Sequence, residues 1–477
     1  MMMDANGHKP AARSLTSVCG VRFFTTPCSY WFFAYPHLMT HSVRTLLVGL
    51  LIVLGGALPA WGQSSGDGSI YSRFGLGEIQ PFASSQAETM GGPGVALRSL
   101  NYTNFSNPAL WSDQVLTRAS FGARYRTLES TSGTDEPDSR LTAGTFEGLQ
   151  FSFPLQDQKL GVAFGFAPTT RSDFRALSSG SFDPGTSGGD PIDYNVEFEG
   201  RGGLQTITGG FGYRINSALS VGASLDYIFG TIETRRSTTF EAGGLEDAVV
   251  TEGIRLTALT STLGAHLTFS DALRDDDNFM IGAAFTLPTE LSGEQTRTLG
   301  ESLDQDTLST SSEGALDMPW TAKVGFAYSP SSALTLTADG VYAPWSSASS
   351  TIGSSSGRPF PVGGTDTFND RVRVSSGLEW TPAGDDTMRG YLSRVAYRLG
   401  VSYEQLYVSP NASTTIEAVE ARIGISLPTA ASGTRIDLSA NVGQQGTTSQ
   451  GLVQDTYYGV SARVSIGERW FQQRRLR

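Results

Sequence analysis

The sequence predicts an all-β fold, a fourteen-stranded antiparallel transmembrane β-barrel, and three observations support this class. A secretion signal lies near the start, apolar and polar residues alternate over repeated stretches, and short connections alternate with long ones. A tilted membrane strand needs about ten alternating residues, and barrels pair short turns on one side with longer loops on the other. Soluble β-sandwiches also alternate, but the signal and the unequal connections favour the barrel.

The first element is a signal peptide over residues 39–62. Met39–Arg44 is short and positively charged, and Leu46–Leu58 is apolar but shorter than the about 20 residues of a membrane helix. Ala60-Trp61-Gly62 then places small residues before the expected cleavage site. The shortness of the apolar stretch Leu46–Leu58 disfavours the alternative, a retained membrane anchor. Because a complete signal begins at Met39, we interpret residues 1–38 as a mis-annotated upstream segment.

The second element is a glycine-rich segment, residues 63–115, that precedes the first clear strand. It contains Ser69–Gly77, Met90–Leu97 and Asn104–Leu110, none of which is low-complexity sequence. The glycines of the second motif and the Asn-Pro step of the third favour tight turns. A compact element of this size could fold inside a wide barrel.

The barrel itself is expected over residues 116–471, followed by a basic tail at 472–477. Alternation is clear in 119–126, 221–229 and 371–380. The short connections are Pro154–Gln158, Asn216–Ala218, Ser270–Asn278, Ser329–Ser332, Pro382–Gly390 and Pro428–Gly433. Six short turns join twelve strands in pairs, and one further strand at each end makes fourteen. An even number places both chain ends on one side, which secretion requires to be the periplasm.

The longer connections are rich in Gly, Ser, Thr and Asp, as solvated loops should be. They fall near 128–141, 169–200, 233–252, 288–316, 346–367, 407–413 and 446–455. We expect them to be outer loops. Aromatic residues near strand ends fit interfacial girdles; they are Tyr213, Trp320, Tyr328, Tyr342, Trp345, Trp380, Trp470 and Phe471.

Charged residues of both signs fall opposite the apolar face of the strands and should therefore face the lumen. The set comprises Arg124, Arg126, Asp226, Lys323, Asp339, Arg371, Arg373, Glu379, Arg398, Arg422 and Arg463. Neighbouring charges in the lumen can pair, which removes the cost of burying them alone. A ladder that only stabilises the barrel is the alternative to a functional role.

The segment before the barrel resembles the hatch of the FadL/TodX family, outer-membrane transporters of long-chain fatty acids and other hydrophobic compounds. The resemblance rests on two motifs. The first comprises Met90, Gly91, Gly92 and Ala96, and the second is the Asn-Pro-Ala sequence at Asn107, Pro108 and Ala109. In that family the motifs belong to an N-terminal hatch that plugs a fourteen-stranded barrel. The opening Tyr71–Gly77 and closing Glu468–Phe471 resemble a branch common in Bacteroidetes-type bacteria.

The third strand, Leu160–Pro168, carries a second local resemblance, because the family's third strand is similarly glycine-rich, ends in proline and kinks to open a lateral gate. Here Pro168 lacks a ladder donor, and Gly161 and Gly165 lack bulk on the inward face. The alternative is a strand that simply ends at Pro168 on entering a loop.

Other chemistry is disfavoured by the residues available. The only cysteines, Cys19 and Cys28, precede the signal, and no nucleophile motif accompanies the single barrel histidine, His266. Asp275–Asp277 lacks the spacing of a calcium loop and is expected to be a solvated turn. The net charge of −12 argues against nucleic-acid binding. We therefore expect no enzyme activity, no cofactor and no metal site.

The resemblance implies passive uptake of a hydrophobic small molecule, a long-chain fatty acid or an aromatic hydrocarbon, gated by the hatch. The expected partners are outer-membrane lipid, this ligand and the barrel-assembly machinery during biogenesis. The sequence departs from the family in its polar, acidic outer loops, which lack an apolar stretch for ligand capture, and in continuing past Phe471. The alternative function is protein secretion or cell-surface attachment by a barrel of the same type.

Overall fold

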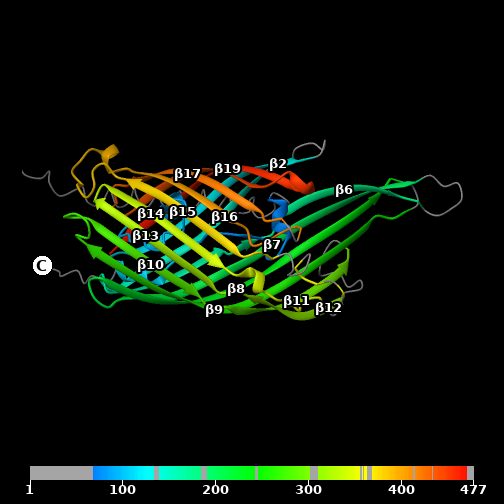
Figure 1. The fold of residues 1–477 in the computed structure, drawn as a ribbon, viewed down its shortest axis with the longest axis horizontal. Helices are drawn as coiled ribbons and strands as arrows, with labels where there is room; N and C mark the ends of the chain where they lie inside the picture. The colour runs from blue at the N-terminus through cyan, green and yellow to red at the C-terminus, as the bar shows by residue number, and fades with distance from the viewer. Residues whose placement is uncertain are drawn as a thin grey trace, which may run out of the picture. The chain divides into compact units, whose positions relative to one another are not determined.

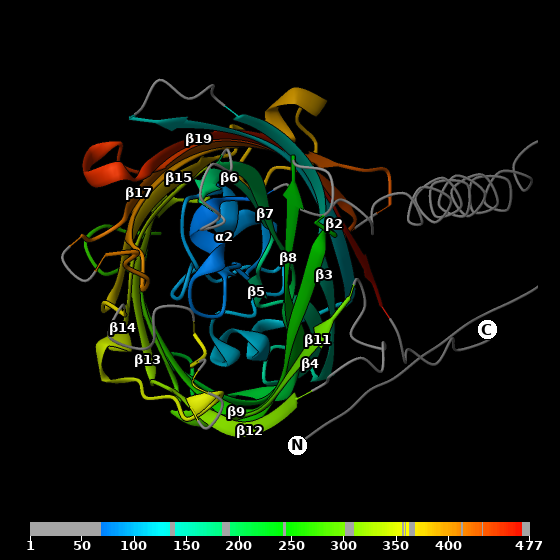
Figure 2. The ribbon, with the colours of Figure 1, turned by 90° about the vertical axis from the view of Figure 1, so that its right-hand side faces the viewer.

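A computed structural model describes residues 68–469, apart from 134–138, 184–190, 242–244, 301–309, 355–356, 358, 362–367, 412–413 and 432. These residues form a closed antiparallel barrel with further elements inside it (Figures 1 and 2). The expected signal peptide at 39–62, the upstream segment 1–38 and the tail 472–477 lie outside the described residues. Trp470 and Phe471 of the expected girdle lie outside them as well.

The wall has fourteen strand positions, and β19 pairs with β2 to close it, so the predicted fold is confirmed. Eleven positions are single strands: β2 (Thr117–Ser132), β3 (Ser139–Gln156), β7 (Ile192–Arg214), β8 (Leu219–Phe240), β9 (Ala248–Ser270), β14 (Leu334–Ala343), β15 (Arg371–Trp380), β16 (Ala396–Gln405), β17 (Glu417–Pro428), β18 (Arg435–Gly446) and β19 (Val453–Glu468).

Three positions are each divided into two segments. They are β4 (Leu160–Pro168) with β6 (Phe174–Phe182), β10 (Asn278–Thr286) with β11 (Thr289–Leu299), and β12 (Thr310–Met318) with β13 (Thr321–Ser331). Each division contains a proline: Pro168, Pro288 or Pro319. Proline has no N–H to donate to the ladder, so the pairing stops and the chain can change direction there.

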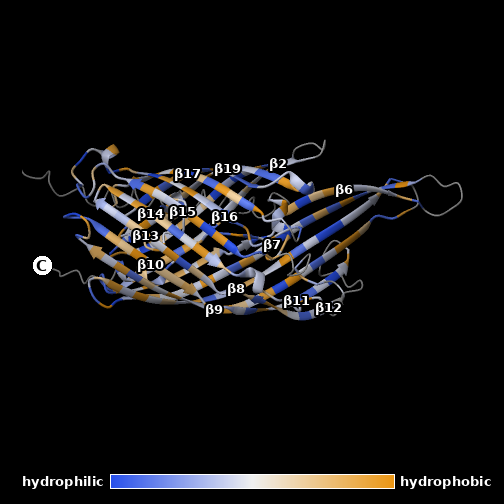
Figure 3. Cartoon of the chain, viewed as in Figure 1, coloured by the Kyte–Doolittle hydropathy of each residue, from blue (hydrophilic) through white to orange (hydrophobic). Residues whose placement is uncertain are grey.

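The outward face of the wall is apolar and the inward face is polar, as alternation requires. In β8, Leu225 is 52 % exposed and lies on the outside, whereas Asp226 points inward and is hydrogen-bonded. Figure 3 shows hydrophobic and hydrophilic residues alternating along the strands of the wall. So many exposed large apolar side chains are stable in lipid but not in water.

The described helices are short, and none is long and apolar enough to cross a membrane.

The long-loop side differs from the sequence prediction. The expected loops at 169–200, 233–252 and 288–316 are largely strand, because β6, β7, β8, β9, β11 and β12 continue into them. Strands β6–β8 project beyond the rest of the wall (Figure 1). Outside lipid the outward face can be polar, so the apolar alternation that marks a membrane strand ends while the hydrogen-bond ladder goes on.

Residues 68–116, called the plug below, lie within the barrel (Figure 2). The plug contains η2 (Ile70–Arg73), β1 (Glu78–Ile79), α2 (Ser85–Thr89) and η3 (Pro108–Asp113). The Ser84 hydroxyl accepts the Ala87 N–H at the start of α2, which is an N-cap. Within the described residues, the plug takes part in one strand pairing, between β1 and β5 (Thr170–Arg171), the short strand that follows β4.

Candidate functional site

The plug touches the wall at a ring of inward-facing glycines, called the glycine belt below. At each member a Cβ atom would lie less than 3.0 Å from a plug atom; the members are Gly161, Gly165, Gly212, Gly222, Gly264, Gly282, Gly377, Gly400 and Gly424. Strand register brings several of them side by side: Gly161 pairs with Gly212, Gly212 with Gly222, and Gly222 with Gly264. Glycine fits here because plug atoms approach the wall too closely for a further side chain; these atoms belong to side chains at Gly165, Gly264 and Gly424 and to the plug backbone at the other members.

The Met90–Ala96 part of the predicted hatch lies against this belt. The backbone of Met90 and Gly91 contacts Gly377 and Gly400, and a side chain at Gly92 would overlap Ser375. Ala96 packs with Met280 and Ala327 in a small core. This motif therefore fits the plug to the wall of β10 and β13–β16.

The Asn-Pro-Ala part starts η3 and lies against the opposite arc of the belt. The Asn107 side chain accepts the Ala109 N–H at 3.0 Å and donates to the Val95 and Ala265 carbonyls at 2.9 and 3.1 Å. Pro108 occupies the first turn, where the missing N–H costs nothing. The motif caps the helix and ties it to both plug and wall.

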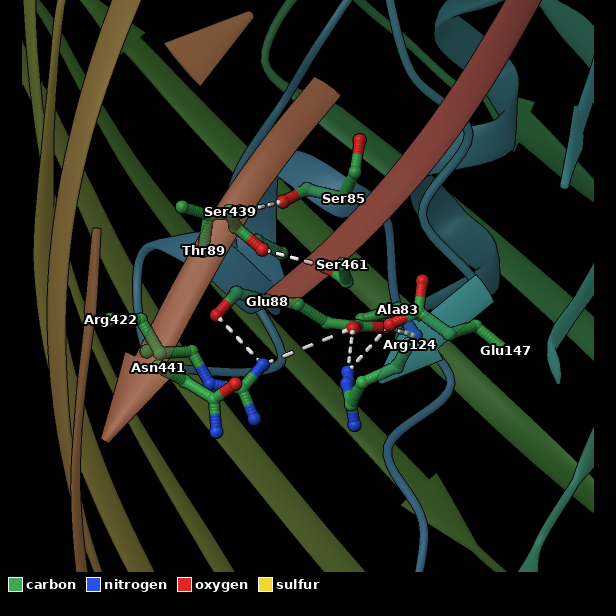
Figure 4. Close-up of polar contacts among 12 residues, drawn as sticks. Ala83, Ser85, Glu88, Thr89, Arg124, Glu147, Arg422, Ser439, Asn441 and Ser461 are labelled. Atoms are coloured by element: carbon green, nitrogen blue, oxygen red, sulfur yellow. Dashed lines mark hydrogen bonds and ion pairs between the residues drawn. The ribbon is translucent and has the colours of Figure 1, made fainter. Parts of the chain in front are cut away.

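A buried ion cluster fixes α2. The Glu88 carboxylate lies 3.1 Å from both Arg124 and Arg463 and 4.0 Å from Arg422. Glu147 of β3 lies 2.8 Å from Arg124 and 3.1 Å from Arg463. Figure 4 shows Glu88 placed between Arg422 and Arg124. Pairing makes these buried charges tolerable, and removing one member would leave the charge of the cluster unbalanced.

A second ion cluster holds the other side of the plug. Arg398 lies 2.6 Å from Glu379 and 2.9 Å from Asp437, and its guanidinium stacks over the Tyr102 ring at 5.0 Å. The Tyr102 hydroxyl donates to Asp437 at 2.7 Å, and Gln86 donates to Glu379 at 2.9 Å. Both plug residues therefore engage charges of the wall.

Three further wall charges reach the plug directly. Arg126 forms two 2.8 Å hydrogen bonds to the Glu78 carboxylate. Burial by itself would raise the pKa of Glu78, but the attraction of Arg126 outweighs it and the pKa is lowered. Arg373 donates to the Gly91 carbonyl at 3.0 Å, and Asp339 accepts the Val95 N–H at 2.8 Å.

The three remaining predicted lumen charges, Asp226, Lys323 and Arg371, line a cavity instead. This cavity, called the chamber below, has a volume of about 260 Å³ and lies between the plug and the long-loop side of the wall. Its apolar lining comes from both plug and wall: Leu76, Ile79, Phe82, Phe105, Leu204, Ile228, Met318, Val341, Trp345 and Tyr407. Polar groups of the plug and of several wall strands also line it, Glu88, Arg373 and Arg422 among them. At one of these strands, Asp226 accepts hydroxyl hydrogen bonds from Thr208 and Thr262 at 2.7 and 2.9 Å.

An aromatic cluster packs beside the chamber. The Trp345 ring lies 4.6 Å from Tyr407 and 5.6 Å from Phe368. The Tyr407 hydroxyl accepts the Leu76 N–H and donates to the Gly77 carbonyl, both at 2.8 Å. This cluster therefore connects the outer connections of the barrel to the plug.

The structure corrects two sequence expectations here. Trp345 was expected in the interfacial girdle, but it is 5 % exposed and packs inside, because Pro344 ends the strand and η4 (Trp345–Ser347) follows it. The sequence also offered no apolar capture stretch, yet the inward residues Leu204, Ile228 and Ile232 form an apolar core at this level. The sequence pattern that could have predicted this core is the inward face of β8, which becomes apolar after Tyr227, at Ile228 and Ile232.

The predicted third-strand residues lie where the plug meets an interrupted ladder. Trp111 approaches Gly161, and Phe82 and Phe105 approach Gly165, so both glycines make room for the plug. Pro168 ends β4, after which β5 pairs with β1 of the plug and β6 resumes pairing with β7. Among the described residues, the half of β3 from Ser139 to Gly148 pairs with β2 only.

The residues considered for other chemistry have structural surroundings. His266 Nε2 lies 3.1 Å from the Ala96 carbonyl oxygen, against the plug. The Asp277 carboxylate accepts backbone N–H groups of Ala272 and Arg274 and so closes the β9–β10 turn. Within the described parts of the chain, no group of three or more His, Cys, Asp or Glu residues is placed to hold a metal.

Comparison with known proteins agrees with this architecture. A family model described as BamG matches residues 43–477. A Pseudomonas aeruginosa FadL homologue superposes with a TM-score of 0.52 at 14 % identity, covering 83 % of this chain and 100 % of its own. The Ralstonia pickettii toluene transporter TbuX gives 0.51 at 15 % identity, covering 82 % and 99 %. The resemblance in fold to FadL-type barrels is therefore confirmed. No curated protein sequence matches the chain.

Proposed function

This chain belongs to the BamG family, and we propose that it is an outer-membrane channel for passive, plug-gated uptake of hydrophobic small molecules. The observation that carries this proposal is the chamber, a largely apolar cavity inside a membrane barrel and directly beside the plug. An aqueous pore would need a continuous polar lumen instead. Ligand sites are typically concave, with apolar walls and placed polar groups, and the chamber combines apolar side chains with threonine hydroxyls and several charged groups.

The size of the chamber favours long-chain fatty acids or aromatic hydrocarbons as ligands. An apolar cavity of about 150 Å³ holds a benzene ring, so about 260 Å³ accommodates a substituted ring or a folded part of an acyl chain. Burial of apolar surface is worth about 25 cal/mol per Å², which is sufficient to draw such a molecule from water. A toluene transporter shares the fold, so toluene is a suitable first ligand.

Uptake would be passive because transfer from water into the apolar chamber is downhill and consumption inside the cell removes the product. With both chain ends in the periplasm, the chamber faces the outside and the plug lies on the way in. Only the two residues of β1 join the plug to another strand, in the pairing with β5. The plug is therefore held mainly by ion pairs and side-chain hydrogen bonds, and it can move when these contacts exchange partners. Exit could then proceed past Pro168, where the ladder beside β3 is interrupted.

Two partners follow from the fold and the family resemblance. Outer-membrane lipid would surround the apolar outer face, and the barrel-assembly machinery would insert the chain. A role in protein secretion or attachment would depend on the projecting strands instead, so it should survive when the chamber is filled.

A pair of tryptophan substitutions in β8 tests the proposal. Ile228 lines the chamber, whereas Leu225 faces lipid on the same strand. Titration of the purified barrel with toluene, followed by tryptophan fluorescence or calorimetry, should give saturable binding for the wild type and for Leu225→Trp. Ile228→Trp should weaken binding at least tenfold, or about 1.4 kcal/mol. Equal affinity in both variants, or no binding by the wild type, would contradict the proposal.

A further inference from the structure

Strand β6 has one edge without a strand partner. All nine of its residues, Phe174–Phe182, pair with β7, and no other described strand pairs with them. The strand borders the part of the sheet that projects beyond the wall (Figure 1). Phe174 is buried, but the side chains farther along the strand are accessible, since Leu177 is 73 % and Phe182 38 % exposed. Within the described parts of the chain, no strand therefore pairs with this edge.

The backbone direction of β6 follows from the residues just before it. The Ser172 N–H donates to the Gly202 carbonyl, on the β7 side, at 2.9 Å. Asp173 points the opposite way: its N–H donates to the Ser72 hydroxyl, which donates back to the Asp173 carbonyl, both at 3.0 Å. Because backbone groups alternate along a strand, every second residue then directs its N–H and C=O to the free edge. These residues are Arg175, Leu177, Ser179 and Ser181.

The free edge lacks the features that usually prevent strand pairing. Natural edge strands are protected by lysines, prolines, bulges or short length. From Ala176 to Phe182, β6 has no charged residue and no proline. Arg175 ion-pairs with Glu197 of β7, so its charge is already partnered within the sheet. The Ser72 hydroxyl of the plug already hydrogen-bonds the backbone of Asp173, immediately before β6 and on the same side.

A second copy of this chain does not fit the edge. Barrel strands tilt about 35–45° from the membrane normal, and two copies in one membrane are related by an axis along that normal. Such an axis keeps both β6 strands pointing to the same side of the membrane, whereas antiparallel self-pairing needs opposite directions. The occupant must instead be a segment that is free to choose its direction.

We propose that the free edge of β6 binds an extended segment of a partner polypeptide by strand addition. Main-chain hydrogen bonds to alternate residues of β6 would supply the affinity, and alternate side chains of the segment would contact the two faces of the sheet. On one face, Phe182 continues into a cluster with Tyr194 and Phe240, with ring centroids 6.2 to 6.4 Å apart. The edge offers no unpartnered charge, so the segment is uncharged along its paired length, with apolar side chains at every second position.

Proline substitution tests the proposal without disturbing the β6–β7 ladder. A Leu177→Pro, Ser179→Pro variant removes two N–H groups that point to the free edge, where proline is tolerated. The control is Leu245→Pro, in the β8–β9 connection and outside the strands. The probe is a fluorescent peptide of about ten residues, matched to the length of β6, with alternating valine and threonine and a lysine at each end. A version with two central prolines is the negative probe.

The wild type and Leu245→Pro should bind the peptide saturably, as measured by fluorescence anisotropy on the full chain in detergent, and should ignore the proline-containing probe. The double variant should lose at least tenfold in affinity while retaining heat-modifiable mobility, which shows that the barrel is folded. Equal affinity of all three proteins, or no saturable binding, would overturn the proposal. Self-association lost in the double variant would assign the edge to a second copy and overturn it as well. Toluene binding in the chamber should be the same in all three proteins.

Discussion

Substitution of alanine for Gly400 should loosen the plug without unfolding the barrel. The added Cβ would overlap the Gly91 nitrogen and the Met90 carbonyl carbon and lie 2.7 Å from the Thr89 oxygen. All three atoms belong to the plug backbone, so they cannot rotate away, and the plug must shift. Overpacking of this kind costs about 1–3 kcal/mol, which raises the population of the displaced plug about five- to 150-fold. Gly340 is the matched control, because a Cβ there meets no atom within 4 Å.

Ion conductance in planar bilayers measures the displaced plug directly. Channels of the Gly400→Ala variant should be open about five to 150 times as often as wild-type channels. Channels of the Gly340→Ala variant should be open as often as those of the wild type. Both substitutions change a strand glycine to alanine, so their effect on the entropy of the unfolded chain, about 0.4–1 kcal/mol, cancels in the comparison. Equal conductance in the two variants, with both barrels folded, would refute the view that the glycine belt seats the plug.

Three further predictions concern the plug charges and the chamber. Glu88→Gln should lower the thermal stability of plug docking by up to about 3–5 kcal/mol, since it removes one carboxylate from a buried cluster in which Glu147 and Glu420 are then left to balance three arginines; an unchanged calorimetric transition would contradict this. The pKa of Glu78 is lowered in the docked plug, so its contribution is complete above its free pKa of about 4.3 and is lost as the pH falls through the lower docked value. Acidification below about pH 4 should therefore weaken plug docking in the wild type, and Glu78→Gln, which lacks this titrating group, should show a smaller increase in proteolysis of the plug on acidification. Trp345→Ala should weaken toluene binding severalfold in calorimetry, whereas Trp380→Ala, at a 51 % exposed position outside, should not.

The strand count was predictable because lipid imposes apolar alternation on the outer face and the short turns carry strong turn residues. The strand extensions were not, because their outward face is polar and only the hydrogen-bond ladder continues. The sequence therefore predicts the part of each strand that lies in lipid, but not the strand extensions on the long-loop side.

The candidate site depended on register, which local patterns do not contain. The Met90–Ala96 and Asn107–Ala109 motifs were noticed through a family resemblance, but their role in contacting wall glycines appears only when Gly212, Gly222 and Gly264 are aligned across three strands. The chamber was missed because Ile228 and Ile232 belong to the inward face, which is polar in the other half of the same strand.

The most direct test of the central claim is the flux of toluene into vesicles whose outer leaflet is lipopolysaccharide. Wild-type barrels should accelerate toluene entry over protein-free vesicles but should exclude a hydrophilic dye, because the plug closes the lumen. Filling the chamber with Ile228→Trp should abolish the toluene flux, and deleting residues 69–110 should admit the dye. Wild-type vesicles that take up toluene no faster than protein-free ones, or no faster than Ile228→Trp vesicles, would contradict the account.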